Sequence, residues 1–162
     1  MADVLVRARR ADDFEALVDL DLASARHHAS IDPESYQVPE RDAVAAFLER
    51  RLGDPAREML VAEVDGDVVG AVDITLVGPH DPGSIVRPIP TADLGISVAE
   101  GWRDRGIGHT LMAAAEANAR ARGAERMILD MSSANAGALR FYRALGYREH
   151  GLLLSRSLPD DG

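Results

Sequence analysis

The chain alternates between segments with the two-residue period of a strand and segments with the wider apolar spacing of a helix. Alternating or unbroken apolar runs predict strands over residues 3–9, 58–64, 67–77, 93–98, 126–131 and 147–157. Apolar residues three or four positions apart predict helices over residues 11–29, 40–52, 107–122 and 135–145. The resulting order of elements, β-α-α-β-β-β-α-β-α-β, is typical of a mixed α/β fold.

Turn residues separate these segments. Asp65-Gly66 lies between two β-rich runs, which is a strong signal for a hairpin. Residues 78–90 are rich in glycine and proline and predict a long loop, either functional or a passive insertion. Residues 159–162 are expected to fray. No repeat or linker interrupts the chain, so we expect a single domain over residues 3–158.

The most informative stretch runs from Asp93 to Leu111. It predicts a buried strand, a short loop rich in glycine and arginine, and then a helix that begins near Ile107. The first amides of a helix have no partner within the helix, and the helix dipole adds partial positive charge there. Gly106 and Gly108 would let a ligand approach the backbone without an intervening Cβ. This junction therefore predicts a phosphate-binding site.

Two common phosphate-binding motifs do not fit this stretch. A dinucleotide fingerprint needs a third glycine where Leu111 stands, and a nucleotide P-loop needs a lysine, whereas all 18 basic residues are arginine. What remains is the pattern Arg103-x-x-Gly106-x-Gly108 directly after a strand. A plain strand-to-helix turn that requires small residues would show the same pattern.

A second pattern lies nearer the C-terminus and reads Asn135-x-x-Ala138-x-x-Phe141-Tyr142-x-x-x-Gly146-Tyr147. The two patterns resemble the signatures of the GNAT N-acetyltransferase superfamily and occur in the family's order. Those signatures are Arg/Gln-x-x-Gly-x-Gly/Ala for the acetyl-CoA pyrophosphate loop and Asn-x-x-Ala-x-x-Phe/Leu-Tyr-x-x-x-Gly-Phe/Tyr. The order of elements matches too, although residues 11–57 match only in topology. The resemblance implies the GNAT acyl-CoA N-acyltransferase fold, an α/β (α+β) architecture with a mixed sheet of six to seven strands and about four helices.

The resemblance also implies acetyl-CoA (coenzyme A) as the cofactor and assigns residues to it. The strand residues Ile96, Ser97 and Val98 would offer backbone groups to the pantetheine arm. Asn135 would contact the cofactor arm by a hydrogen bond, and Ala138 is a further contact from the same motif. The pyrophosphate would be held by the loop and the start of the helix, namely Arg103, Asp104, Arg105, Gly106, Ile107, Gly108, His109 and Thr110.

Tyr142 is the residue that the resemblance places near the thioester sulfur, where it can protonate the leaving thiolate. A phenol with its ordinary pKa of about 10 keeps its proton at neutral pH, and a thiolate with a pKa of about 8.5 can share it. An aromatic ring packed on the inner face of the helix is the alternative. The flanking Asn135 and Gly146 favour the role as an acid.

The group that takes the proton from the amine is less evident. Deprotonating an alkyl amine with a pKa near 10.4 at pH 7 costs about 4–5 kcal/mol. Many family members place a glutamate at the strand position that is Ala92 here. Asp93, our candidate catalytic base, is one residue along and would point to the opposite face unless a bulge re-aims it. His80, Asp81 and Glu100 are further candidates, and a water relay or a less basic amine would need no dedicated base.

Composition and charge limit the classes of ligand and partner that we expect for this chain. The chain has no cysteine, which excludes disulfides, thiolate metal sites and a cysteine nucleophile, and we expect no metal. No apolar run approaches a membrane span and no secretory signal is evident, so a soluble, cytoplasmic protein without membrane contact is expected. The net charge of −9 argues against nucleic-acid binding. Residues 1–90 carry this whole net charge, which favours a cationic acceptor, but a solvated acidic surface explains it equally well.

The expected function is therefore an acetyl-CoA-dependent N-acetyltransferase that moves an acetyl group directly to a primary amine of a small molecule or peptide. A transferase that uses another acyl-CoA or a hydroxyl acceptor is one alternative. A non-catalytic acyl-CoA-binding or regulatory module is another; the intact Tyr142 disfavours it and the missing glutamate at Ala92 favours it. The acceptor would be set by residues 24–40 and 78–92. Members of the family often dimerise, so a homodimer is compatible with the resemblance.

Overall fold

The computed structural model of the protein describes residues 3–78 and 80–157, so the terminal residues 159–162 lie outside the described residues. The chain forms two compact units that divide between Asp130 and Met131, and each is described by itself. The first unit holds a sheet and the helices α1, α2 and α3, and the second holds the helix α4. The expected mixture of helices around one mixed sheet is confirmed.

The sheet of the first unit has five strands, fewer than the six to seven expected. They are β1 (Leu5–Ala8), β2 (Arg57–Val64), β3 (Asp67–Val77), β4 (Thr91–Val98) and β5 (Arg126–Ile128). Their order in the sheet follows the chain, and every neighbouring pair is antiparallel except β4 and β5. A parallel pair needs a crossover connection, which α3 (Ile107–Ala121) supplies.

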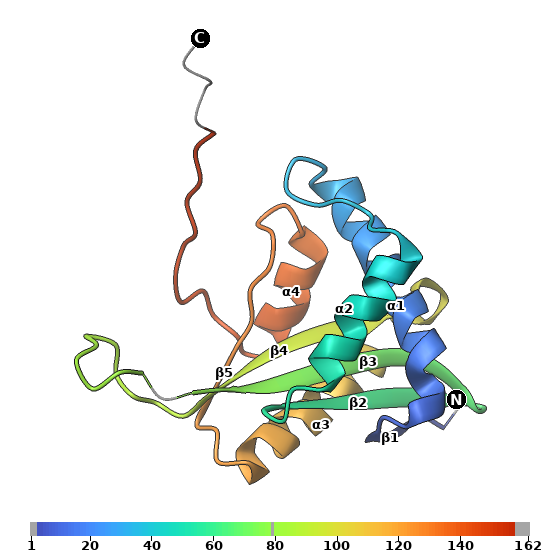
Figure 1. Cartoon of the computed structure of the whole chain (residues 1–162), viewed down its shortest axis with the longest axis horizontal. Coiled ribbons are helices and arrows are strands. Elements are labelled where there is room, and N and C mark those ends of the chain that lie inside the picture. Colours follow the sequence, from blue (N-terminus) through green and yellow to red (C-terminus); the bar gives the residue numbers. More distant parts are fainter. Residues whose placement is uncertain (1–2, 79, 158–162) are drawn as a thin grey trace. The chain divides into compact units, whose positions relative to one another are not determined.

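Helices cover both faces of this sheet (Figure 1). α1 (Phe14–Ile31) and α2 (Arg41–Leu52) pack with Met59 and Val61 of β2, whereas α3 packs with the alternate residues Leu60 and Ala62. Because both faces are buried, β2 and β3 read as nearly continuous apolar runs instead of alternating ones.

The turn between β2 and β3 confirms the predicted hairpin. Asp65 and Gly66 both have positive φ, 51° and 91°, which is the backbone that a tight two-residue hairpin turn requires. The strands pair from Arg57 opposite Thr75 to Val64 opposite Asp67, with one irregularity between Ala62 and Glu63.

The second unit corrects one prediction. α4 (Ala136–Ala144) forms, but residues 147–157 have no strand structure. The side chains of Leu152, Leu153 and Leu154 are 89%, 98% and 86% exposed. Consecutive leucines have no two-residue alternation, and an extended segment becomes a strand only where it finds a neighbouring strand to pair with. β5 is also shorter than predicted, because it ends at Ile128 and not at 131.

A buried ion-pair network anchors β1 to the start of α1. Arg7 donates to both carboxylate oxygens of Asp13, at 2.7 and 2.8 Å, and to Glu63 of β2 at 2.7 Å. Asp13 is only 5% exposed. The hydrogen bonds from Arg7 lower the pKa of Asp13, against the opposing effect of burial.

Replacing Arg7 with methionine is expected to lower the free energy of unfolding by about 3–5 kcal/mol, because Asp13 would be left buried and uncompensated. Urea unfolding measures this change. Arg10→Met is the control, because Arg10 is exposed and contributes its backbone amide to Asp13. Since the pKa of Asp13 is lowered, its contribution is present above the unfolded pKa of about 3.9 and is lost as the pH falls through the folded pKa. An equal loss in both variants would contradict this role for Arg7.

Candidate active site

The two central strands separate part-way along their length. β4 and β5 pair only from Thr91 opposite Arg126 to Asp93 opposite Ile128, although β4 continues to Val98. Beyond Asp93, β4 pairs with β3 alone, so its other edge is free among the described residues of the first unit. We call this separation the fork.

The ladder between β3 and β4 decides which backbone groups face this free edge. The amide of Ala99 donates to the carbonyl of Val69, and hydrogen-bonding direction alternates along an antiparallel strand. The amides and carbonyls of Leu94, Ile96 and Val98 therefore point to the free edge. Ser97, predicted with its neighbours as a backbone contact, directs its backbone groups toward β3 instead.

A loop and a helix start follow directly after this edge. Gly106 precedes α3 with φ of +83° and Asp104 has φ of +59°, so the chain turns through two left-handed residues before Ile107. A side chain at Gly106 would be strained by this backbone. The turn leaves the first amides of α3 without partners within the helix, which is the arrangement that favours a bound anion.

Arg103 and Arg105, the two arginines of the loop, each contact a neighbouring residue. Arg103 Nε donates to the carbonyl oxygen of Val98 at 3.3 Å, and the Arg105 guanidinium lies 5.1 Å from the centre of the Trp102 ring. Thr110 Oγ1 donates back to the carbonyl of Gly106 at 3.2 Å. The predicted pyrophosphate residues from Arg103 to Thr110 therefore form one continuous turn at the end of β4.

Asp93 stands at the fork itself. Burial and the negative charge of Asp130 raise the pKa of Asp93, while a hydrogen bond from the Leu94 amide and the charge of Arg57 act in the opposite direction. A carboxylate with a raised pKa is a better proton acceptor than an ordinary aspartate, because its conjugate acid is weaker.

No bulge re-aims this side chain. β3 and β4 pair without a shift in register from Thr91 to Val98, so Asp93 and Ala92 point to opposite faces of the sheet. Ala92 is fully buried in the cluster under α3. Asp93 shares the face of α1 and α2, in the same row as Thr75 and Arg57.

The other candidate bases lie elsewhere in the first unit. Asp81 closes a local turn, accepting from the Gly83 amide at 2.7 Å, and His80 neighbours it in the long loop. Glu100 begins the short 3-10 turn Glu100–Trp102. His27 lies within electrostatic reach of this segment: burial and the charges of Arg103 and His28 lower its pKa, while the charge of Glu100 acts in the opposite direction.

The second unit holds the residues of the second motif. Asn135 precedes α4, and its side-chain oxygen accepts from the Ala138 amide at 3.0 Å. Asn135 is therefore the helix cap, a function that asparagine favours and that the sequence analysis missed. Burial raises the pKa of Tyr142 to about 12, and its ring lies 5.2 Å from Phe141 and 5.9 Å from Tyr147.

Comparison with known proteins decides the family. The sequence profile of the acetyltransferase (GNAT) family matches residues 17–147, which is most of the chain and includes both motifs. The chain belongs to the GNAT acetyltransferase family. The predicted family and enzyme class are thereby confirmed, and acetyl-CoA is the cosubstrate consistent with them.

Individual relatives of this GNAT chain agree. The L-amino acid N-acetyltransferase AaaT of Escherichia coli is 30% identical over 156 residues, which cover 93% of this chain and 86% of that protein. A solved variant of the BH1408 protein from Bacillus halodurans superposes with a TM-score of 0.86 at 20% identity, covering 96% of this chain and 99% of that one. The aminoglycoside N-acetyltransferase AAC(6')-Iy, solved with a CoA-containing bisubstrate analogue, gives a TM-score of 0.72 at 23% identity, covering 98% and 100%.

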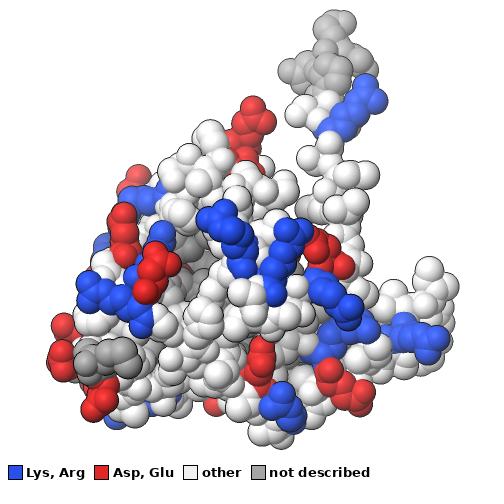
Figure 2. Space-filling view, turned by 180° about the vertical axis from the view of Figure 1, so that it is seen from behind, with Lys and Arg blue, Asp and Glu red and all other residues white. Residues whose placement is uncertain are grey.

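The surface of this acetyltransferase carries both signs of charge. On the side of the sheet that α3 covers, arginine side chains stand among acidic ones (Figure 2). Within residues 3–78 and 80–157, no helix is long and apolar enough to cross a membrane.

Proposed function

We propose that this enzyme transfers the acetyl group of acetyl-CoA directly to the primary amine of a small molecule or peptide. The fork carries this proposal, because it offers a free strand edge that leads into a loop and helix start suited to phosphate. Two of the proteins named above are an L-amino acid N-acetyltransferase and an aminoglycoside N-acetyltransferase; both substrate classes are amines, which supports the same acceptor chemistry.

The free edge would bind the pantetheine arm of the cofactor, and the loop would bind its pyrophosphate. Extended groups with amide donors and acceptors, such as pantetheine, can add to a free strand edge as another strand would. Ile96 and Val98 would supply those backbone contacts, and the amides from Asp104 to Gly108 would hold the pyrophosphate. Bound acetyl-CoA supplies a thioester whose carbonyl carbon accepts an amine.

Asp93 is the proposed proton acceptor. It lies at the inner end of the free edge, so an amine that reaches a thioester held there passes close to its carboxylate. The ammonium proton must leave before or as the nitrogen attacks, and a carboxylate of raised pKa takes it at a lower free-energy cost. Asp93 then holds the proton that the amine has lost.

Tyr142 is the proposed donor to the leaving sulfur, an assignment that rests on the family motif. With a pKa of about 12, its phenol is a weaker acid than free tyrosine and transfers its proton less readily. Tyr142→Phe is therefore expected to lower kcat by about a hundredfold, the lower end of general acid catalysis, with little change in the KM for acetyl-CoA. Tyr147→Phe is the control from the same ring cluster, and equal losses in both variants would assign Tyr142 a packing role.

The experiment that tests the function is a panel of amine acceptors with acetyl-CoA: L-amino acids, an aminoglycoside, a polyamine and a peptide with a free N-terminus. A thiol reagent reports the released CoA without background from the protein, because the chain has no cysteine. The expected result is acceptor-dependent thiol release with at least one class. Tight binding of acetyl-CoA with no turnover on any amine would favour the non-catalytic module, and faster turnover with longer acyl-CoA would favour another acyl donor.

We also propose that residues 3–158 act as one domain. The family profile extends across the division between Asp130 and Met131, which supports this proposal. Such a domain could prefer cationic acceptors, which the acceptor panel measures. It could also form a homodimer, which light scattering measures.

A further inference from the structure

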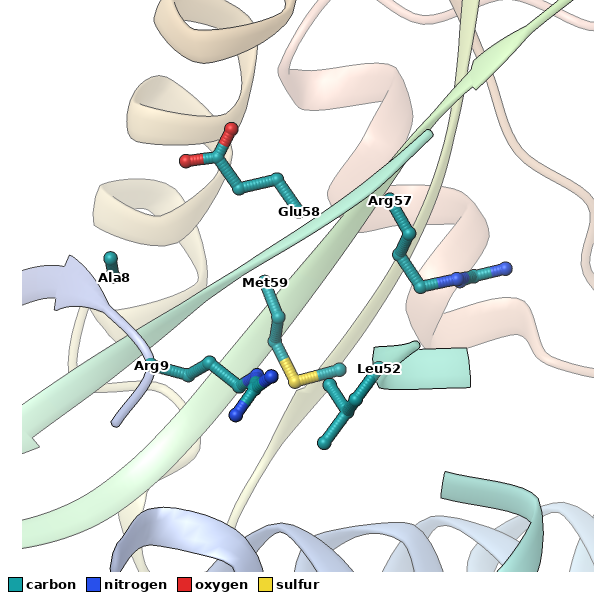
Figure 3. A pocket seen from close by; sticks show the side chains of 6 residues that line it. All are labelled: Ala8, Arg9, Leu52, Arg57, Glu58 and Met59. Atoms are coloured by element: carbon teal, nitrogen blue, oxygen red, sulfur yellow. The ribbon is translucent and has the colours of Figure 1, made fainter. Parts of the chain in front are cut away.

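A cavity of about 280 Å³ lies in the first unit at the side of the sheet opposite to β5. It is lined by Ala8, Arg9, Leu52, Arg57, Glu58 and Met59, from the end of β1, the end of α2 and the start of β2 (Figure 3). Strand order places β3 between this cavity and β4, but Arg57, which lines the cavity, lies in the same row of the sheet as Asp93 and acts on it electrostatically.

Arg9 brings an uncompensated charge to this cavity. Its amide donates to the carbonyl of Met59, which places its side chain on the face of α1 and α2. Arg7, two residues earlier on the same face, is paired with two carboxylates, whereas the Arg9 guanidinium forms no ion pair with any described residue. A half-buried arginine in this position favours an anionic partner.

Arg57 brings a second, partly satisfied guanidinium. Its Nη1 is bonded to Asp73, which also accepts from Arg51 at 2.7 Å. Its Nε is buried and has no hydrogen-bond partner among the described residues. The Arg57 guanidinium is directed away from Arg9 and Met59 in Figure 3, so Arg9 is the arginine that lies next to the apolar wall. Burial and the charge of Arg51 lower the pKa of Arg57, while the charges of Asp54 and Asp93 act in the opposite direction.

The acidic residues nearby are occupied elsewhere. Glu58 directs its side chain away from Arg9 and Met59 in Figure 3, and its carboxylate lies 3.9 Å from Arg122. Asp54, which acts on Arg57 electrostatically, accepts from the Ala56 amide at 2.9 Å. The remaining wall of the cavity, Leu52 and Met59, is apolar (Figure 3).

We propose that this cavity binds a small aliphatic carboxylate, with the carboxylate at Arg9 and the hydrocarbon part against Leu52 and Met59. The planar guanidinium group matches a carboxylate in geometry, and the apolar wall favours such a ligand over inorganic phosphate. The site goes beyond the proposed transferase function and does not depend on it.

The test is a titration of the full chain with hexanoate, followed by two-dimensional ¹H–¹⁵N NMR. Saturable shifts are expected at the amides of Ala8, Arg9 and Met59, and not at those of Ile96 and Val98. Arg9→Gln should weaken binding by about tenfold, as expected for loss of one charged hydrogen-bonding partner. Arg10→Gln, which changes an exposed neighbouring arginine, should leave the affinity unchanged.

Two further probes make the proposal falsifiable. Hexanamide has the same shape without the charge and should bind at least tenfold more weakly, and phosphate should not displace hexanoate at equal concentration. The proposal is overturned by shifts that do not saturate or lie elsewhere, by equal affinity in Arg9→Gln, or by equal affinity for hexanamide. Displacement by phosphate would contradict the proposed contact between the hydrocarbon part of the ligand and the apolar wall. Acetyl-CoA titrated into Arg9→Gln should bind as in the unaltered protein, which keeps this test separate from that of the transferase.

Discussion

Replacing Gly106 with valine is expected to lower the affinity for acetyl-CoA by at least about a hundredfold. Gly106 has φ of +83°, and a β-branched residue cannot adopt this backbone without strain. Relaxing that strain would turn the amides at the start of α3 away from the pyrophosphate. Each hydrogen bond to a charged group is worth about 1.5–3 kcal/mol, and 1.4 kcal/mol is tenfold in affinity, so the loss of two such donors gives this effect.

Gly101→Val is the matched control for this variant. Gly101 lies in the same connection, has an ordinary φ and has open space around its Cα hydrogen. Isothermal titration with acetyl-CoA should show near-normal affinity for Gly101→Val, and circular dichroism should show that both variants are folded. Normal affinity in folded Gly106→Val would mean that the turn has only a structural role.

Asp93→Asn is expected to lower kcat/KM for the amine by about a hundredfold to ten-thousandfold, the usual contribution of a positioned general base. Asparagine has nearly the same shape, so acetyl-CoA should bind with unchanged affinity. The measurement is the thiol-release assay with the best acceptor of the panel. Glu100→Gln, which changes another acid close in the sequence, is the control, and a loss confined to Glu100→Gln would move the base to that residue.

The pH profile gives an independent measure of the same residue. The base must be ionised, so kcat/KM should fall as the pH decreases through the raised pKa of Asp93. Asp130→Asn removes the negative charge that, together with burial, raises this pKa, so the acidic limb should move to lower pH. A limb that does not move would show that another group titrates.

The stability of the variants separates a catalytic Asp93 from a structural one. A raised carboxylate pKa means that ionised Asp93 is disfavoured in the folded chain, and this cost is present at pH values above the folded pKa. Asp93→Asn should therefore raise Tm at neutral pH while activity falls. A structural aspartate would lower both.

Local pattern was enough to predict the central part of the fold. The alternation along β4, the shift to helical spacing at Ile107 and the glycine at position 106 are properties of adjacent residues, and the structure has the same strand, left-handed turn and helix. The Asp65-Gly66 hairpin was predictable for the same reason.

Features that depend on distant partners were not predictable. Whether residues 147–157 form a strand depends on a neighbouring strand edge, which no local pattern supplies. The position of Asp93 at the fork depends on where β5 ends, and the apolar run of β5 continues past the last paired residue, Ile128. The family motif assigned Asn135 to the cofactor. Its hydrogen bond from the Ala138 amide is predictable on other grounds, because asparagine is common at the starts of helices.

Amide hydrogen exchange with and without saturating acetyl-CoA tests directly whether the cofactor binds at the fork, because it reports on the free edge of β4 residue by residue. We expect slower exchange for the amides of Ile96 and Val98 and for those from Asp104 to Gly108, with little change at Ser97, whose amide already faces β3. Saturating acetyl-CoA that leaves Ile96, Val98 and this loop unprotected would contradict the assignment of the cofactor to the fork.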